Sequence, residues 1–323
     1  MSESAAKKIL VTGGSGFAGS HLLEHLLKNT PHSLFGTYLN EDSLKILHNT
    51  LKEVSFKKLD LTSEDETLLL IKEIKPDYIF HLAAFSSSAA SFDFPKETIV
   101  NNINSQINLL EAVKNAKIDP KILVVSSGDI YGQVKKEDLP IKEDVVFNPS
   151  SPYSVSKIAQ DFLALQYFLS FGLRIVRVRP FNHIGPRQSP DFVVSAFAKK
   201  IAEIEKGQGG LTLNVGNLSS ERDFTDVVDI VRGYWEVLEK GRAGDVYNMG
   251  SGRAVKIENV LKILLSFSSK EIKVKEDPSL FRPSENKTLV CDCSKIKKEI
   301  GWENSIKLEA SLKNVLDYWR NII

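Results

Sequence analysis

Two residues in the middle of this sequence have the types and the spacing of an acid–base pair. They are Tyr153 and Lys157, in the string Tyr-Ser-Val-Ser-Lys. The preceding string Asn-Pro-Ser-Ser-Pro predicts a helix start, with a hydroxyl cap and then proline in the first turn. On this helix Tyr153 and Lys157 lie on one face. A free tyrosine has a pKa of about 10 and a nearby ammonium group lowers it, so the pair predicts proton transfer.

A hydroxyl group that could polarise a substrate carbonyl is expected at the end of a buried strand. The apolar run 121–125 stops at Ser126 and Ser127. Side chains alternate between the two faces of a strand, so only one of these serines can face a given side. We predict that Ser127 faces the substrate. The alternative is a polar strand terminus without a chemical role.

Three glycines near the N-terminus could hold a phosphate group. Gly13, Gly16 and Gly19 follow a β-branched apolar run and precede a stretch with helical periodicity. In such a turn the first glycine permits the sharp bend, the second lets the backbone approach a pyrophosphate and the third lets the helix pack on the strand. The helix N-terminus then offers N–H groups to the phosphates. A glycine-rich turn without a ligand is the alternative. Together with Tyr153 and Lys157, the loop predicts a nicotinamide-dependent oxidoreductase.

The end of the second strand, 34–38, bears on the choice between NAD and NADP. An acidic residue there would bind the ribose 2′-hydroxyl of NAD, but Leu39 and Asn40 follow the strand. NADP(H) is therefore favoured and NAD(H) is the alternative. Asp60 and Leu61 follow the next apolar strand and are expected to contact the adenine. A helix cap is an equally good interpretation of Asp60.

The elements that must position these residues alternate along the first half of the chain. We expect strands near 8–12, 34–38, 54–59, 77–82, 121–126 and 173–178, with helices near 19–28, 63–75, 97–117 and 152–171. This alternation predicts an α/β fold with a doubly wound parallel sheet. Its ligand would lie beyond the carboxyl ends of the strands, where Gly13, Ala83, Ser127 and Pro180 all fall.

After Pro180 the alternation gives way to loops rich in glycine, asparagine, serine and proline. We therefore expect a smaller C-terminal substrate domain. The expected dinucleotide-binding domain comprises 1–180 with returning segments near 224–262 and 308–323. The expected substrate domain comprises 181–223 and 263–307.

The motifs together resemble a known family. Thr12-Gly-x-x-Gly-x-x-Gly, His81-Leu-Ala-Ala and Tyr153-x-x-x-Lys157 are similar to those of the extended short-chain dehydrogenase/reductases, which have a Rossmann fold. Phe-Asn-His-Ile-Gly-Pro at 181–186 and Arg-Pro-Ser-Glu at 282–285 resemble the sugar-nucleotide branch, and within it the reductases of GDP-4-keto-6-deoxy sugars. The resemblance covers nearly the whole chain.

The resemblance implies roles for particular residues. The implied catalytic residues are Ser127, Tyr153 and Lys157. The implied cofactor-binding residues are Gly13, Gly16, Phe17, Gly19, Asn40, Asp60, Leu61, Leu82, Ala83, Ala84, Tyr153, Lys157, Pro180 and His183. The implied substrate-binding residues are Ser86, Asp129, Asn182, Arg187, Arg222, Arg282 and Glu285.

Arginine binds phosphate oxygens in a bidentate manner, so Arg222 and Arg282 are the residues expected on the diphosphate. A surface or interdomain salt bridge is the alternative for each. Glu285 is expected to accept from guanine or a ribose hydroxyl, and Asn182 to donate to the sugar or the diphosphate. Arg187 stands where related reductases have a small residue, and it could add a phosphate contact or narrow the pocket.

The implied activity is NAD(P)H-dependent reduction of the 4-keto group of a GDP-4-keto-6-deoxy sugar, which gives GDP-D-rhamnose. One alternative is a nucleotide-sugar 4,6-dehydratase. Asp129 stands where those enzymes have the glutamate that removes the sugar C5 proton, and it is one methylene shorter. A 4-epimerase and a non-catalytic NAD(P)-sensing module are also compatible with the resemblance.

The composition bears on partners and location. The 323 residues include 42 Lys and Arg and 41 Asp and Glu, so the net charge of +1 argues against nucleic acid or a membrane surface as a partner. No apolar run approaches the length of a membrane span. Cys291 and Cys293 lack the further ligands of a zinc site, so we expect no metal and a reduced, cytoplasmic protein. Helices near 102–116 and 152–171 have apolar outer faces, which by analogy predict a homodimer.

Overall fold

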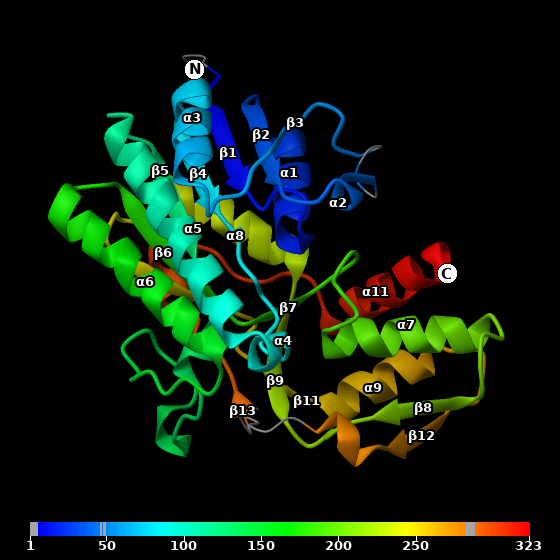
Figure 1. The fold of residues 1–323 in the computed structure, drawn as a ribbon. Helices are drawn as coiled ribbons and strands as arrows, with labels where there is room; N and C mark the ends of the chain where they lie inside the picture. Colours follow the sequence, from blue (N-terminus) through cyan, green and yellow to red (C-terminus); the bar gives the residue numbers. More distant parts are fainter. Residues whose placement is uncertain (1–5, 46, 48–49, 282–287) are drawn as a thin grey trace.

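The main body of the protein is a parallel sheet of seven strands with helices on both faces (Figure 1). The computed structural model describes residues 6–45, 47, 50–281 and 288–323. The strand order is β10-β6-β5-β4-β1-β2-β3. The strands are β1 Lys8–Thr12, β2 Ser33–Tyr38, β3 Ser55–Lys58, β4 Tyr78–His81, β5 Lys121–Val125, β6 Ile175–Pro180 and β10 Val246–Met249. The expected doubly wound parallel sheet is confirmed.

The central strands β1, β4 and β5 are apolar on both sides because each face of the sheet is covered, whereas the edge strand β3 has no buried residue. Leu10 of β1 belongs to one core and its neighbours Ile9 and Val11 belong to the other. The helices α3 Glu64–Ile74, α5 Pro95–Asn115 and α6 Pro152–Phe171 cover the first face. The helices α1 Phe17–Asn29, α8 Val227–Lys240 and α10 Ser294–Ile300 cover the second face. Alternate residues of a strand point to opposite faces, so both layers are anchored on the same strands.

Helix α6 begins and ends where its sequence signals predict. Ser151 is the N-cap, and its hydroxyl oxygen accepts a hydrogen bond from the backbone N–H of Ser154 at 3.1 Å. Pro152 occupies the first helical position, where its missing N–H costs nothing. Gly172 ends the helix in the left-handed conformation, with φ of 70°. These signals fix the position of Tyr153 in the first turn of α6.

A second lobe contains two small sheets and three helices, which extend from the centre to the lower right of Figure 1. Its strands are β7 Asn182–Ile184, β8 Thr212–Val215, β9 Glu221–Asp226, β11 Ala254–Lys256, β12 Lys273–Glu276 and β13 Thr288–Leu289. Its helices are α7 Val193–Glu205, α9 Ile257–Ser266 and α11 Leu308–Ile322. The short helices α2 Asp42–Lys45 and α4 Ala90–Asp93 and the 3₁₀ turns η1 Gly128–Tyr131, η2 Lys136–Asp138 and η3 Pro278–Leu280 complete the described elements.

The tail helix α11 lies in a different place from the one that the sequence predicts. It packs on α7 and α9 in the second lobe, whereas we expected 308–323 to return to the main sheet. Two polar contacts hold the helix there. The indole N–H of Trp319 donates to the hydroxyl of Ser195 at 3.0 Å, and Arg320 pairs with Glu205. Conversely, α10 and the fully buried Trp302, which we expected in the substrate domain, belong to the core of the main sheet.

Within the described ranges, no helix combines the length and the apolar character that crossing a lipid bilayer requires.

Candidate active site

The turn from β1 into α1 has glycine where the backbone leaves no room for a side chain. Gly13 has φ of +68°, and a Cβ atom there would lie 3.0 Å from the backbone of Ala83. A Cβ atom at Gly19 would lie 2.2 Å from the carbonyl oxygen of Gly13, a distance that atoms do not tolerate. Gly16 is the N-cap of α1. The N-terminus of α1 is therefore a bare backbone surface, which fits a pyrophosphate group.

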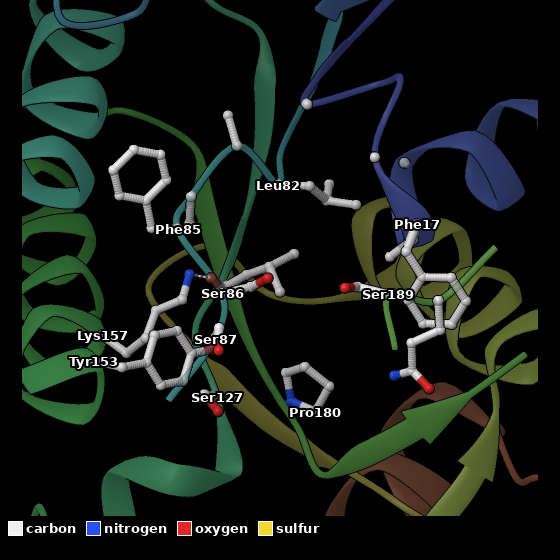
Figure 2. A pocket seen from close by; sticks show the side chains of 18 of the residues that line it. Phe17, Leu82, Phe85, Ser86, Ser87, Ser127, Tyr153, Lys157, Pro180 and Ser189 are labelled. Atoms are coloured by element: carbon white, nitrogen blue, oxygen red, sulfur yellow. Dashed lines mark hydrogen bonds between the residues drawn. The ribbon is translucent and has the colours of Figure 1, made fainter. Parts of the chain in front are cut away.

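A cavity of about 540 Å³ lies over this turn and the carboxyl ends of the central strands. Most of the predicted cofactor-binding residues line it, and they are Gly13, Gly16, Phe17, Gly19, Asp60, Leu61, Leu82, Ala83, Ala84, Tyr153, Lys157, Pro180 and His183. Figure 2 shows Phe17 on one side of this cavity and Tyr153 and Lys157 on the other, with Leu82 and Pro180 between them. The glycine loop and the Tyr/Lys pair thus share one cavity.

Asn40 is the exception among the predicted cofactor residues. Among the described residues, its neighbour Leu39 lines the cavity and Asn40 lies outside it. The Asn40 side-chain oxygen accepts from the backbone N–H of Asp42 at 2.9 Å, so this residue caps the next turn. Asp60 lines the cavity, and its carboxylate accepts from the N–H of Thr62 at 2.9 Å. It does not cap the next helix, because the N-cap of α3 is Ser63.

Tyr153 and Ser127 face each other at one end of the cavity (Figure 2). Burial raises the pKa of the Tyr153 phenol well above its usual range, the negative charge of Asp129 raises it further, and a hydrogen bond with Ser127 opposes the increase. The expected lowering of this pKa is therefore wrong for the cofactor-free protein, because burial raises it and the opposing contribution comes from Ser127. Tyr153 is a protonated phenol at neutral pH.

Lys157 is buried behind Tyr153 on α6. Its ammonium group donates a hydrogen bond to the backbone carbonyl of Val125 at 2.8 Å. Burial lowers the pKa of Lys157 to about 7, and the carboxylate of Asp161 works against this decrease. The lysine charge is thus held in place by the end of β5, the strand that also leads to Ser127. The neighbouring Ser126 turns toward α6, where its hydroxyl contacts the carbonyl of Lys157.

A second cavity of about 330 Å³ adjoins the first and extends into the second lobe. Asp129, Asn182 and His183 line both cavities, so they mark the junction. Of the predicted substrate-binding residues, Arg222 lines the second cavity and Ser86 lines the first. Arg282 and Glu285 lie outside the described residues.

Arg187 has a position that the sequence did not indicate. Its guanidinium group lies against α1, where it donates to the hydroxyl of Ser20 at 3.1 Å and pairs with Glu24 at 2.9 Å. It lines the first cavity, on the side of the glycine loop. The imidazole of His183 stacks on the ring of Phe17, with centroids 5.7 Å apart, and donates from Nδ1 to the carbonyl of Phe181. Arg187 and His183 therefore connect the loop 182–191 to the first turns of α1.

A buried ion network, which was not predicted from the sequence, supports helix α6. Asp161 on α6 is fully buried and accepts hydrogen bonds from Arg177 at 2.7 Å and from Arg179 at 2.8 Å. Arg179 also donates to the hydroxyl of Tyr131 at 2.8 Å. The network therefore joins α6, β6 and the turn that carries Ser127. A sequence signal was present, because Asp161 continues the helical face of Tyr153 and Lys157 at the next i+4 position.

Among the described residues there is no group of three or more histidine, cysteine or acidic side chains placed to hold a metal ion. The Sγ atoms of Cys291 and Cys293 lie 3.2 Å apart, and Cys293 also contacts the carbonyl of Gly250.

Comparison with known proteins agrees with this geometry. A family model described as GDP-mannose 4,6 dehydratase matches residues 10–315. GDP-6-deoxy-D-mannose reductase of Pseudomonas aeruginosa is 34% identical over 316 residues, which are 98% of each chain. The solved structure of RMD from Pseudomonas aeruginosa complexed with NADPH has a TM-score of 0.84 and 32% identity, and the match covers 98% of this chain and 100% of that one. UDP-glucose 4-epimerase from Thermotoga maritima with UDP-glucose has a TM-score of 0.85 and 28% identity, covering 97% and 99%. The chain therefore belongs to the GDP-mannose 4,6-dehydratase family of the extended short-chain dehydrogenase/reductases.

Proposed function

We propose that this enzyme reduces the 4-keto group of GDP-4-keto-6-deoxy-D-mannose to give GDP-D-rhamnose. The observation that carries the proposal is the meeting of Ser127, Tyr153 and Lys157 at one end of a cavity whose other end is a glycine loop. The name and the cofactor of the Pseudomonas aeruginosa relatives support this assignment. Consumption of NADPH by the keto sugar, one for each sugar reduced, tests it. Turnover without net loss of reduced cofactor would instead indicate an enzyme that recycles it.

Each residue of the site has a different role in the proposed reaction. When bound, NADPH supplies the hydride that is added to C4 of the sugar. Tyr153 donates its proton to the oxygen on C4, and its raised pKa keeps that proton available at neutral pH. The hydroxyl of Ser127 donates a hydrogen bond to the same oxygen. Lys157, held by the carbonyl of Val125, orients the ribose next to the nicotinamide.

NADP(H) is the cofactor that we propose, with NAD(H) as the alternative. The glycine turn fits a dinucleotide because a Cβ atom at Gly19 would occupy the space of the Gly13 carbonyl. The strand β2 ends in Tyr38 and is followed by Leu39 and Asn40, so no carboxylate stands at the position that selects the ribose 2′-hydroxyl of NAD. A relative of the same fold has been solved with NADPH.

We further propose that the second cavity binds the GDP part of the substrate. Arg222 lines this cavity and carries the charge that a diphosphate requires. Asn182 and Asp129 stand at the junction with the first cavity, where the sugar ring would reach Tyr153. The assignments of Arg282 and Glu285 to the nucleotide stay predictions from the sequence.

The role of Asp129 distinguishes reduction from dehydration. Dehydration is the main alternative because the matching family is described as GDP-mannose 4,6 dehydratase. A dehydratase needs a base that removes the proton from C5, within about 2.6–3.2 Å of it. A reductase needs no such base. We therefore expect Asp129→Asn to leave reduction of the keto sugar within about tenfold of wild type, a cost below roughly 1.4 kcal/mol. Steady-state kinetics with NADPH measures this.

The companion measurement follows the C5 hydrogen during turnover in deuterium oxide. A reductase leaves it in place, so mass spectrometry should find no deuterium at C5. An inactive Asp129→Asn variant, or deuterium at C5 with GDP-mannose as substrate, would favour the dehydratase.

We propose a homodimer in which α5 and α6 of two subunits pack together. Val155, Phe162 and Leu169 are large apolar side chains of α6 that are exposed in the single chain. A dimer would cover them, and Phe162→Asp is expected to shift the mass found by light scattering from dimer to monomer, because a buried unpaired carboxylate is costly. A monomeric wild type would contradict this proposal.

We place the enzyme in the cytoplasm, which its two free thiols support.

A further inference from the structure

A second tyrosine lines the wall of the first cavity. Tyr234 lies on α8, on the face of the sheet opposite to α6, and its side chain is 0% exposed. Its ring borders the same cavity as Tyr153, Lys157 and Pro180. Its hydroxyl oxygen is buried, and it has no hydrogen-bond partner among the described residues. A buried phenol without a partner costs free energy, so a ligand that supplies an acceptor would be stabilised there.

Helix α8 is held in place in a way that fixes this side chain. The carboxylate of Asp226 caps the helix by accepting from the N–H of Val228 at 2.8 Å. Next to Tyr234, a Cβ atom at Gly233 would lie 2.3 Å from the side chain of Met249 and 2.7 Å from the indole of Trp302, so glycine allows close packing. Side chains on a helix lean toward its N-terminus, and that end of α8 lies beside Gly185 of the active-site loop. The phenol is therefore directed toward the strand ends.

Tyr234 and Tyr153 line the same cavity, and the charge of an ionised Tyr153 would act on Tyr234. Burial raises the pKa of Tyr234 far above its usual value. Ser127 faces Tyr153, whereas Tyr234 has no such neighbour among the described residues to favour ionisation. Of the two phenols, Tyr234 is thus suited only to donate a hydrogen bond and not to transfer a proton.

We propose that Tyr234 is a cofactor-positioning residue whose O–H donates to the carboxamide oxygen of the nicotinamide of bound NADP(H). The proposal rests on the proposed function, since it requires that the nicotinamide occupies the end of the cavity near Tyr153. The phosphates belong at the N-terminus of α1, and Lys157 serves the ribose, so the carboxamide is the remaining acceptor at this end. Its hydrogen bond would fix the rotation of the ring from which the hydride leaves.

The test uses Tyr234→Phe, which removes the hydroxyl and keeps the ring. We expect the Kd for NADPH, measured by calorimetry, to rise about tenfold, as loss of one buried hydrogen bond predicts. The Kd for 2′,5′-ADP, which lacks the nicotinamide, should not change. The Tm of the cofactor-free protein should stay the same or rise, because the hydroxyl that is removed had no partner among the described residues.

Tyr167→Phe is the matched control. Tyr167 is a largely buried tyrosine on α6, its hydroxyl donates to Glu111 at 2.7 Å, and it does not line the cavity. Loss of this hydroxyl should lower Tm slightly and leave both Kd values unchanged. An unchanged Kd for NADPH in Tyr234→Phe, or an equal increase for 2′,5′-ADP, would overturn the proposal. A fall in Tm without any effect on NADPH would show a structural hydroxyl. Failure of the wild type to bind either ligand would instead overturn the proposed function itself.

Discussion

Tyr153→Phe is expected to lower kcat for reduction of the keto sugar by about 10²–10⁴-fold, the usual contribution of a positioned acid–base group. The substitution removes the proton donor and keeps the ring that packs at the start of α6. The hydride would then add to a carbonyl whose developing oxygen charge receives a hydrogen bond from Ser127 but no proton. Burial raises the pKa of this phenol, so the substitution removes a hydroxyl that is protonated at neutral pH.

The measurement is steady-state kinetics at saturating NADPH, with binding of NADPH and Tm as controls. Both controls should stay close to wild type, since the substitution removes one hydroxyl and keeps the ring. Tyr167→Phe, which removes a hydroxyl from the same helix outside the cavity, should retain full activity. A Tyr153→Phe variant with near-wild-type kcat would exclude the tyrosine as proton donor. A variant that also loses NADPH binding would assign it to the cofactor rather than to the proton.

The parts of the structure that were predictable are those whose signals are local. The glycine turn could be predicted because its requirements are local: Gly13 has a positive φ, and a Cβ atom at Gly19 would meet the carbonyl of Gly13. The start of α6 was predictable because Ser151 and Pro152 act on the first turn alone. Once the cap is fixed, the helix period places Tyr153 and Lys157 on one face. The parallel order of strands then follows from the alternation of strands and helices.

The position of α11 was not predictable in the same way. Its apolar side chains, such as Leu312 and Leu316, form a stripe that could cover either core, because amphipathicity says which face is buried and not against what. The choice is made by partners far away in the sequence, such as Ser195 for the indole of Trp319. The same limit applies to Tyr234. The sequence of α8 does not show that this side chain lines the first cavity.

Charge effects in the site also escaped prediction, because they depend on burial. From spacing alone, Lys157 should lower the pKa of Tyr153. In the folded protein both groups are removed from water, which raises the pKa of Tyr153 and lowers that of Lys157. Similarly, Arg177 and Arg179 are two positions apart on a strand, a spacing that puts them on one face but says nothing about burial. Only the structure shows that they are 5% and 4% exposed and share the carboxylate of Asp161.

That shared carboxylate leads to the second large effect. Asp161→Asn is expected to lower the free energy of unfolding by about 3–5 kcal/mol, because it leaves two buried guanidinium groups without their counter-charge. Asparagine has nearly the same size, so a cavity is not the cause. In a chain of this size the loss corresponds to a fall in Tm of roughly 5–15 °C. Calorimetry of the cofactor-free protein measures it.

Asp317→Asn is the matched control. Asp317 pairs with Lys313 and Arg320 at the surface, so the loss of its charge should cost below about 1 kcal/mol.

The pH dependence of this loss identifies its cause. Burial alone would raise the pKa of Asp161, but the hydrogen bonds and charges of Arg179 and Arg177 outweigh it, so the pKa in the folded protein is lowered. A carboxyl group with a lowered pKa stabilises the fold above its unfolded pKa of about 3.9 and loses this contribution as the pH falls through the folded value. The difference in stability between wild type and Asp161→Asn should therefore be full at pH 7 and shrink below about pH 4. A difference that does not change with pH would show that Asp161 acts through packing and not through its charge.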